Sequence, residues 1–115
     1  MRKLSLEQRI RKLERLISNE NVSLTDFDCD RLESVINLHL KKFGCTAEIE
    51  DDNADYGFVN AGIYGKDGEY VTDYDISAVE YNLFEITNDD KKVKSVNSYN
   101  EIGKAIADHY GKNFA

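Results

Sequence analysis

The chain of 115 residues contains no proline and no tryptophan, and it has only two cysteines and two histidines. The lack of proline excludes a Pro-rich recognition segment and prolyl isomerisation as a slow folding step. Cys29 and Cys45 fall at a predicted helix start and at the opening of a predicted strand, so their spacing suggests no disulfide framework. We therefore expect two core thiols in a cytoplasmic protein.

Long apolar runs are also missing from the sequence. No run approaches the roughly 18 residues of a membrane span, and a charged amphipathic pattern, not an apolar signal core, follows Met1. We expect no membrane partner. The length fits one domain, residues 1–115, with a modest core.

Basic residues are almost absent from the middle of the chain. Residues 45–90 contain thirteen Asp or Glu and a single basic residue, Lys66, for a net charge of −12. The flanking segments are basic, with a net charge of +2 over residues 1–44 and +3 over residues 91–115. The overall charge of −7 therefore originates in the middle segment.

Two helices are predicted before residue 45. The first starts at a capping box, residues 5–8, and has an apolar stripe at helical spacing: Leu6, Ile10, Leu13 and Ile17. The second is predicted to be capped by Ser23 or Thr25 and to end at a left-handed Gly44. Its first turn would hold three acids (Asp26, Asp28 and Asp30), and its buried face would be Leu32, Val35, Ile36, Leu40 and Phe43.

After Gly44 the apolar period changes from 3.6 to 2, which predicts strands. We expect them over residues 45–50, 56–64, 69–76, 79–87 and 92–96, with four-residue hairpin loops at 65–68 and 88–91. A second capping box at residues 98–101 starts a last helix that Gly111 would end. The predicted fold is α+β (ααββββα): an N-terminal helical hairpin, an antiparallel meander of about four strands, and a C-terminal helix on the same face.

Few residues are suited to catalysis or metal binding. His39 and His109 lie within helical patterns that explain them as packing or boundary residues, and no catalytic or nucleotide-binding motif is present. A zinc site of Cys29, His39 and Cys45 would lack the paired Cys-x-x-Cys spacing. Residues 51–55 match the start of a calcium loop, but Tyr56 and Gly62 stand where that loop needs glycine and glutamate. We expect a protein that is not an enzyme and has no cofactor or metal.

The stripe of the first helix could also form a coiled coil. It covers about two heptads, fewer than a persuasive seam, so packing onto the core is the preferred interpretation and we expect a monomer or weak homodimer. A basic face of this helix (Arg2, Arg9 and Lys12) could touch nucleic acid, but the overall acidity opposes direct binding.

Carboxylates and tyrosines alternate in the acidic segment. The candidate partner-binding residues are Glu48, Glu50, Asp51, Asp52, Asp55, Tyr70, Asp73, Tyr74, Asp75 and Glu80. One interpretation is a solubilising, edge-protecting surface. The other is a surface that meets a basic partner, because attraction speeds encounter and tyrosines add contact area.

Residues 4–17 and the acidic sheet resemble small acidic proteins of phages and mobile elements, of the anti-CRISPR inhibitor type. The resemblance implies a decoy for nucleic acid and transfers no functional residue. Our first hypothesis is a non-enzymatic inhibitor or adaptor that presents the acidic segment to a basic, nucleic-acid-binding site on a protein such as a CRISPR nuclease. The alternatives are an oligomeric interaction module built through the first helix and an unrecognised enzyme.

Overall fold

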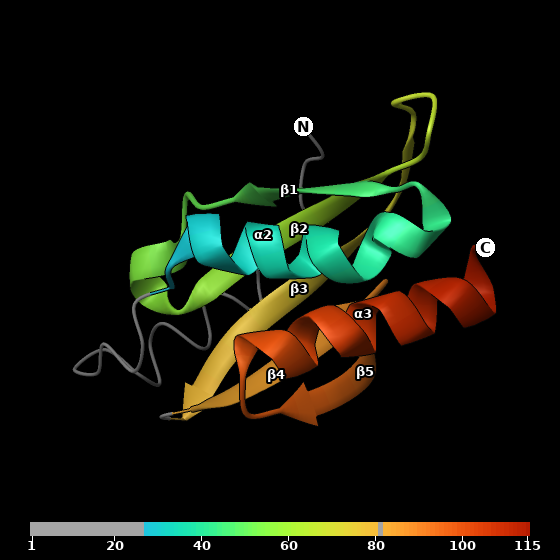
Figure 1. Cartoon of the computed structure of the whole chain (residues 1–115). Coiled ribbons are helices and arrows are strands. Elements are labelled where there is room, and N and C mark those ends of the chain that lie inside the picture. Colours follow the sequence, from blue (N-terminus) through green and yellow to red (C-terminus); the bar gives the residue numbers. More distant parts are fainter. Residues whose placement is uncertain (1–26, 81) are drawn as a thin grey trace.

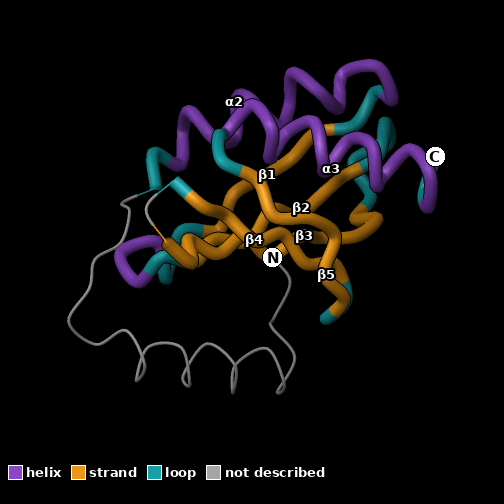
Figure 2. Tube along the Cα trace, turned by 90° about the horizontal axis from the view of Figure 1, so that it is seen from below, coloured by secondary structure: helices purple, strands orange, loops and turns teal. Residues whose placement is uncertain are grey.

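The computed structural model describes residues 27–80 and 82–115. Its elements are helix α2 (Cys29–Leu40), strands β1 (Thr46–Glu50), β2 (Phe58–Tyr64), β3 (Tyr70–Glu80), β4 (Leu83–Asn88) and β5 (Lys91–Val96), and helix α3 (Tyr99–Asn113). Two 3-10 turns, η1 (Lys41–Phe43) and η2 (Ala54–Tyr56), precede β1 and β2. The strands form one antiparallel sheet in chain order, and α2 and α3 lie side by side on one face of it (Figures 1 and 2).

This architecture confirms the α+β class, the antiparallel meander and the C-terminal helix. The sheet has five strands, one for each predicted range but one more than the ααββββα order contains. The first predicted helix lies outside the described residues, so the N-terminal helical hairpin stays a prediction.

Helix α2 begins later than the sequence predicted. Its cap is Asp28, whose carboxylate accepts a hydrogen bond from the N–H of Arg31 at 3.1 Å. The N–H of Asp28 in turn donates to the hydroxyl of Tyr99 at 2.8 Å. Aspartate caps helices as well as serine does, and the bond to Tyr99 fixes this residue where the helix starts. At the other end Gly44 is left-handed (φ 70°), as predicted.

The boundary between β3 and β4 was predicted wrongly. The sequence suggested a break at residues 77–78, but β3 continues to Glu80 and the turn includes Asn82, which has a φ of 56°. Ser77 and Ala78 stay in the sheet because both pair with β4. Asparagine tolerates the left-handed region better than most residues, which explains the later turn. The next hairpin is tighter than predicted, with only Asp89 and Asp90, both at positive φ, between the strands.

Helix α3 begins at the predicted capping box but runs past its predicted end. Ser98 accepts from the N–H of Glu101 at 3.2 Å, whereas Gly111 lies inside the helix, which continues to Asn113. A Cβ on Gly111 would lie 2.8 Å from Cζ of Phe43, so this glycine allows the helix to approach η1. Glycine serves close packing here, not helix termination.

The core lies between the two helices and the sheet. Leu32, Ile36 and Leu40 of α2 are fully buried, as the sequence predicted, and Ile102 and Ile106 of α3 join them. The helix-facing side of the sheet supplies Ala47, Ala61, Ile63, Tyr74, Ile76 and Ile86. Because strand residues alternate between faces, this core determines which residues lie on the opposite side of the sheet.

Candidate functional site

We call the sheet surface opposite α2 and α3 the outer face. In the pairing register, Glu48 of β1, Gly62 of β2 and Asp73 of β3 form one row across it. The next row contains Glu50, Asn60, Asp75 and Thr87. Alternation along the strands therefore collects the carboxylates of three adjacent strands on one surface.

The free edge of β1 is covered by polar side chains of α2. The Asn37 side chain accepts from the N–H of Ala47 at 2.7 Å and donates to the C=O of the same residue at 3.1 Å. A Glu33 carboxylate oxygen accepts from the N–H of Ile49 at 3.0 Å. These bonds satisfy backbone groups that an edge strand would otherwise offer to another strand.

Asn60 links two carboxylates at the centre of the outer face. Its side-chain amide donates to Asp73 at 2.8 Å and to Asp75 at 3.0 Å. The hydroxyl of Tyr70 donates to the other oxygen of Asp73 at 3.2 Å. Asp73 is only 2% exposed, so this carboxylate belongs to the framework that orders the surface around it.

The candidate residues differ in exposure and in the side of the sheet on which they lie. Glu48, Asp51, Asp52, Tyr70 and Glu80 are exposed, while Glu50 and Asp75 are half-buried. Asp73 is on the outer face but buried, and Tyr74 is fully buried on the helix side, which removes it from the candidate surface. Asp55 lies in η2, and its side chain is outside the described part of the structure.

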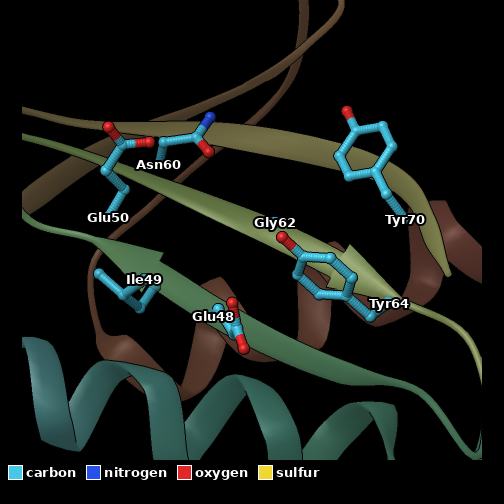
Figure 3. A pocket seen from close by; sticks show the side chains of 7 residues that line it. All are labelled: Glu48, Ile49, Glu50, Asn60, Gly62, Tyr64 and Tyr70. Atoms are coloured by element: carbon cyan, nitrogen blue, oxygen red, sulfur yellow. The ribbon is translucent and has the colours of Figure 1, made fainter. Parts of the chain in front are cut away.

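A glycine at the centre of the outer face leaves a hollow. Its volume is about 100 Å³, and it is lined by Glu48, Ile49, Glu50, Asn60, Gly62, Tyr64 and Tyr70. Figure 3 shows Glu50 beside Asn60 at one end of the hollow and the two tyrosines at the other, with Glu48 and Gly62 between them. Asn60, Gly62 and Tyr64 were absent from the predicted site. A glycine inside a strand often marks a close approach, and this signal could have identified the position.

The two tyrosines form an aromatic corner. The centroids of Tyr64 and Tyr70 lie 6.1 Å apart, and their rings meet edge to face at 75°. A Cβ on Gly62 would come within 3.3 Å of the Tyr64 ring, so this ring leans over the glycine. The bond from Tyr70 to Asp73 holds the second ring. Both tyrosine rings are therefore positioned by contacts within the sheet.

Both histidines make bonds between elements of the fold. His39 Nε2 lies 2.9 Å from Oδ1 of Asn100, which joins α2 to α3. His109 Nδ1 lies 2.9 Å from the Tyr74 hydroxyl, and burial lowers the pKa of His109 while it raises that of Tyr74. These contacts account for both residues as packing residues.

The three residues that were considered and disfavoured as zinc ligands do not converge. Cys29 and His39 lie ten residues apart on α2, about 15 Å along its axis. Cys45 instead contacts the Tyr110 hydroxyl at 3.2 Å, and this hydrogen bond, together with burial, raises the pKa of Tyr110 to about 12. In residues 27–80 and 82–115, no group of three or more His, Cys, Asp or Glu side chains could hold a metal ion.

Comparisons with protein-family models, curated proteins and solved structures found no match. Within the described part of the chain, neither helix has the length and apolar character needed to cross a membrane.

Proposed function

We propose that this protein is a non-enzymatic inhibitor or adaptor whose outer sheet face binds a basic surface on a partner protein. The contact residues would be exposed carboxylates such as Glu48 and Asp52, together with Tyr64 and Tyr70, which line the same hollow as Glu48. Long-range attraction would speed encounter, and the tyrosines would provide apolar contact area.

The main support for this proposal is that side chains of α2 already cover the edge of β1. Charged side chains protect an edge strand where its backbone N–H and C=O groups are free to pair with another strand. Asn37 and Glu33 already bind these groups, so edge protection does not explain Glu48 and Glu50. With edge protection removed, a solubilising surface and recognition of a cationic partner are left, and the tyrosines beside Glu48 favour recognition.

The distribution of charge over the sheet supports the same interpretation. Lys91, Lys92 and Lys94 lie on β5, at the edge opposite β1. Acidic residues therefore outnumber basic residues on strands β1 to β3, where the electric fields of the carboxylates add. A surface of this kind repels nucleic acid and attracts a protein cleft built for phosphate groups.

The charge distribution along the chain resembles that of anti-CRISPR inhibitors, so a CRISPR nuclease is a specific example of such a partner. A cytoplasmic location and a monomeric or weakly dimeric state belong to the same proposal. So does the absence of direct nucleic-acid binding, cofactor and catalysis.

Binding kinetics with a captured partner test the proposal. The partner is recovered on the immobilised full chain from the native host, purified, and measured against wild type and a Glu48→Lys/Asp52→Lys variant across salt concentrations. Both positions are exposed, so the fold should tolerate the change. We expect association to slow about tenfold at low salt, with a smaller difference at high salt.

The matched control is Asp30→Lys/Asp108→Lys, which makes the same change in net charge at exposed positions on α2 and α3. It should keep near-wild-type association. Equal slowing in both variants would mean that only net charge matters. A partner with a neutral or acidic contact surface would refute the proposal directly.

A further inference from the structure

The hollow at Gly62 combines two features that favour a cation. Carboxylates of Glu48 and Glu50 lie along β1, and the faces of two tyrosine rings close the other end (Figure 3). Among the described residues that line the hollow, none carries a positive charge. Aromatic faces attract cations through the ring quadrupole, and carboxylates accept charge-assisted hydrogen bonds.

The shape of the hollow favours a planar cation. Tyr64 and Tyr70 meet at 75°, so a flat group that stacks on one ring meets the edge of the other. A guanidinium group can stack on an aromatic face while its N–H groups bind a carboxylate in the ring plane, whereas an ammonium group is more strongly hydrated and has no plane to stack. The glycine lets the Tyr64 ring lie close to the sheet at the floor of the hollow, because a Cβ at that position would come within 3.3 Å of this ring.

The lining is less suited to a divalent metal ion. Calcium takes six to eight oxygen ligands, and magnesium demands octahedral geometry, whereas two glutamates from one strand supply few oxygens. The aromatic corner would also contribute nothing to such a site.

We infer that this hollow is a binding site for an arginine side chain, in which the exposed Glu48 binds the guanidinium group, Glu50 adds negative charge beside it, and the group stacks on the Tyr64 ring and meets the edge of the Tyr70 ring. The inference rests on the proposed function, because it names the anchor residue of the basic partner. Arginine is over-represented among interface hot spots, and a partly enclosed aromatic pocket is the setting in which such anchors contribute most.

Two small peptides test the site without any knowledge of the partner. The blocked tripeptide N-acetyl-glycyl-arginyl-glycinamide and its lysyl counterpart carry equal charge and are titrated into the full chain. Aromatic NMR signals of Tyr64 and Tyr70 report on binding. We expect the arginyl peptide to shift both rings saturably, with a roughly millimolar Kd, and the lysyl peptide to bind at least about threefold more weakly.

Matched variants locate the site. Glu48→Gln removes one lining carboxylate and should weaken the arginyl peptide about threefold to tenfold, as expected for one charged contact near the surface. Glu80→Gln makes the same charge change at the far end of β3 and should have no effect. Tyr64→Leu removes the stacking ring but keeps an apolar side chain over Gly62. It should also weaken binding of the arginyl peptide. Circular dichroism checks that this variant is folded.

Four results would overturn the assignment: no saturable shift of the tyrosine rings, equal binding of both peptides, equal weakening by the two glutamine variants, or unchanged binding by a folded Tyr64→Leu protein. The two proposals fail in distinguishable ways. If the peptides do not bind but the captured partner remains sensitive to Glu48→Lys/Asp52→Lys, the arginine site is wrong and the acidic face stands. If the arginyl peptide binds as expected but charge reversal leaves the partner's association unchanged, the arginine site stands and the proposed function fails.

Discussion

Gly103 lies where helix α3 packs closely against helix α2, and its replacement by alanine gives a sharp test of the fold. In an unobstructed helix, Gly→Ala stabilises by about 1 kcal/mol through helix propensity. Here the added Cβ would lie 2.6 Å from Cδ2 of His39 and 3.1 Å from both Cγ1 and the carbonyl oxygen of Val35. The sign of the effect therefore depends on whether these neighbours can move.

Neither neighbour can move cheaply. The carbonyl of Val35 is part of the α2 backbone, and His39 is held at 2.9 Å by Asn100. Overpacking of this kind costs about 1–3 kcal/mol, which exceeds the gain in propensity. We expect Gly103→Ala to lower the free energy of unfolding by about 1 kcal/mol.

Urea unfolding followed by circular dichroism measures this loss as a lower midpoint with an unchanged m-value. Gly111→Ala is the matched control, because it is in the same helix and meets only the ring of the half-buried Phe43. That ring can shift, so the control should be neutral or slightly stabilising. If Gly103→Ala is as stable as wild type, or the two variants behave alike, the packing argument is wrong.

Three further changes have defined outcomes. Ser98→Ala removes the α3 cap and should cost about 1 kcal/mol in urea unfolding, whereas Ser98→Thr, which retains the cap, should cost less. Burial lowers the pKa of His109 from 6.5, so below pH 6.5 the unfolded chain binds more protons than the folded chain. The free energy of unfolding should therefore decrease as the pH falls from 6.5 toward the pKa of the folded state. His109→Gln should flatten this part of the pH profile. Asn60→Asp replaces the amide between Asp73 and Asp75 by a third carboxylate; unfolding at neutral pH should show a loss of more than about 2 kcal/mol, which shrinks in acid as the carboxyl groups become protonated.

Local patterns were sufficient for much of the fold. The change of apolar period at Gly44 and the capping box at Ser98 depend on neighbours in sequence, and the structure has both. The hairpin loop after β2 was also predicted in the right place, but it spans residues 65–69 instead of 65–68. The break between β3 and β4 was placed too early in the sequence because Ser77 and Ala78 have weak strand propensity. The N–H of Ala78 donates to the C=O of Gly57 at 2.9 Å, a distant contact that no local pattern reveals.

The candidate surface was predictable only in outline. Alternation within Asp73-Tyr74-Asp75 implies that the two aspartates share a face and that Tyr74 lies on the other, so the wrong placement of Tyr74 was avoidable. The hydrogen bonds from Asn60 to both aspartates could not be predicted, because they depend on the pairing register between β2 and β3. The hollow likewise depends on the cross-strand pairing of Gly62 with Glu48.

The two edges of the sheet determine how a partner can approach it. On β1, side chains of α2 bind the outward backbone groups of Ala47 and Ile49, so an extended peptide cannot add to this edge without displacing them. On β5, Lys91, Lys92 and Lys94 oppose strand addition in the way edge lysines commonly do. Recognition by β-augmentation is therefore disfavoured at both edges. Under the proposed function, a partner would instead contact the side chains of the outer face, and the specificity of that contact would depend on the carboxylates and the aromatic corner around Gly62.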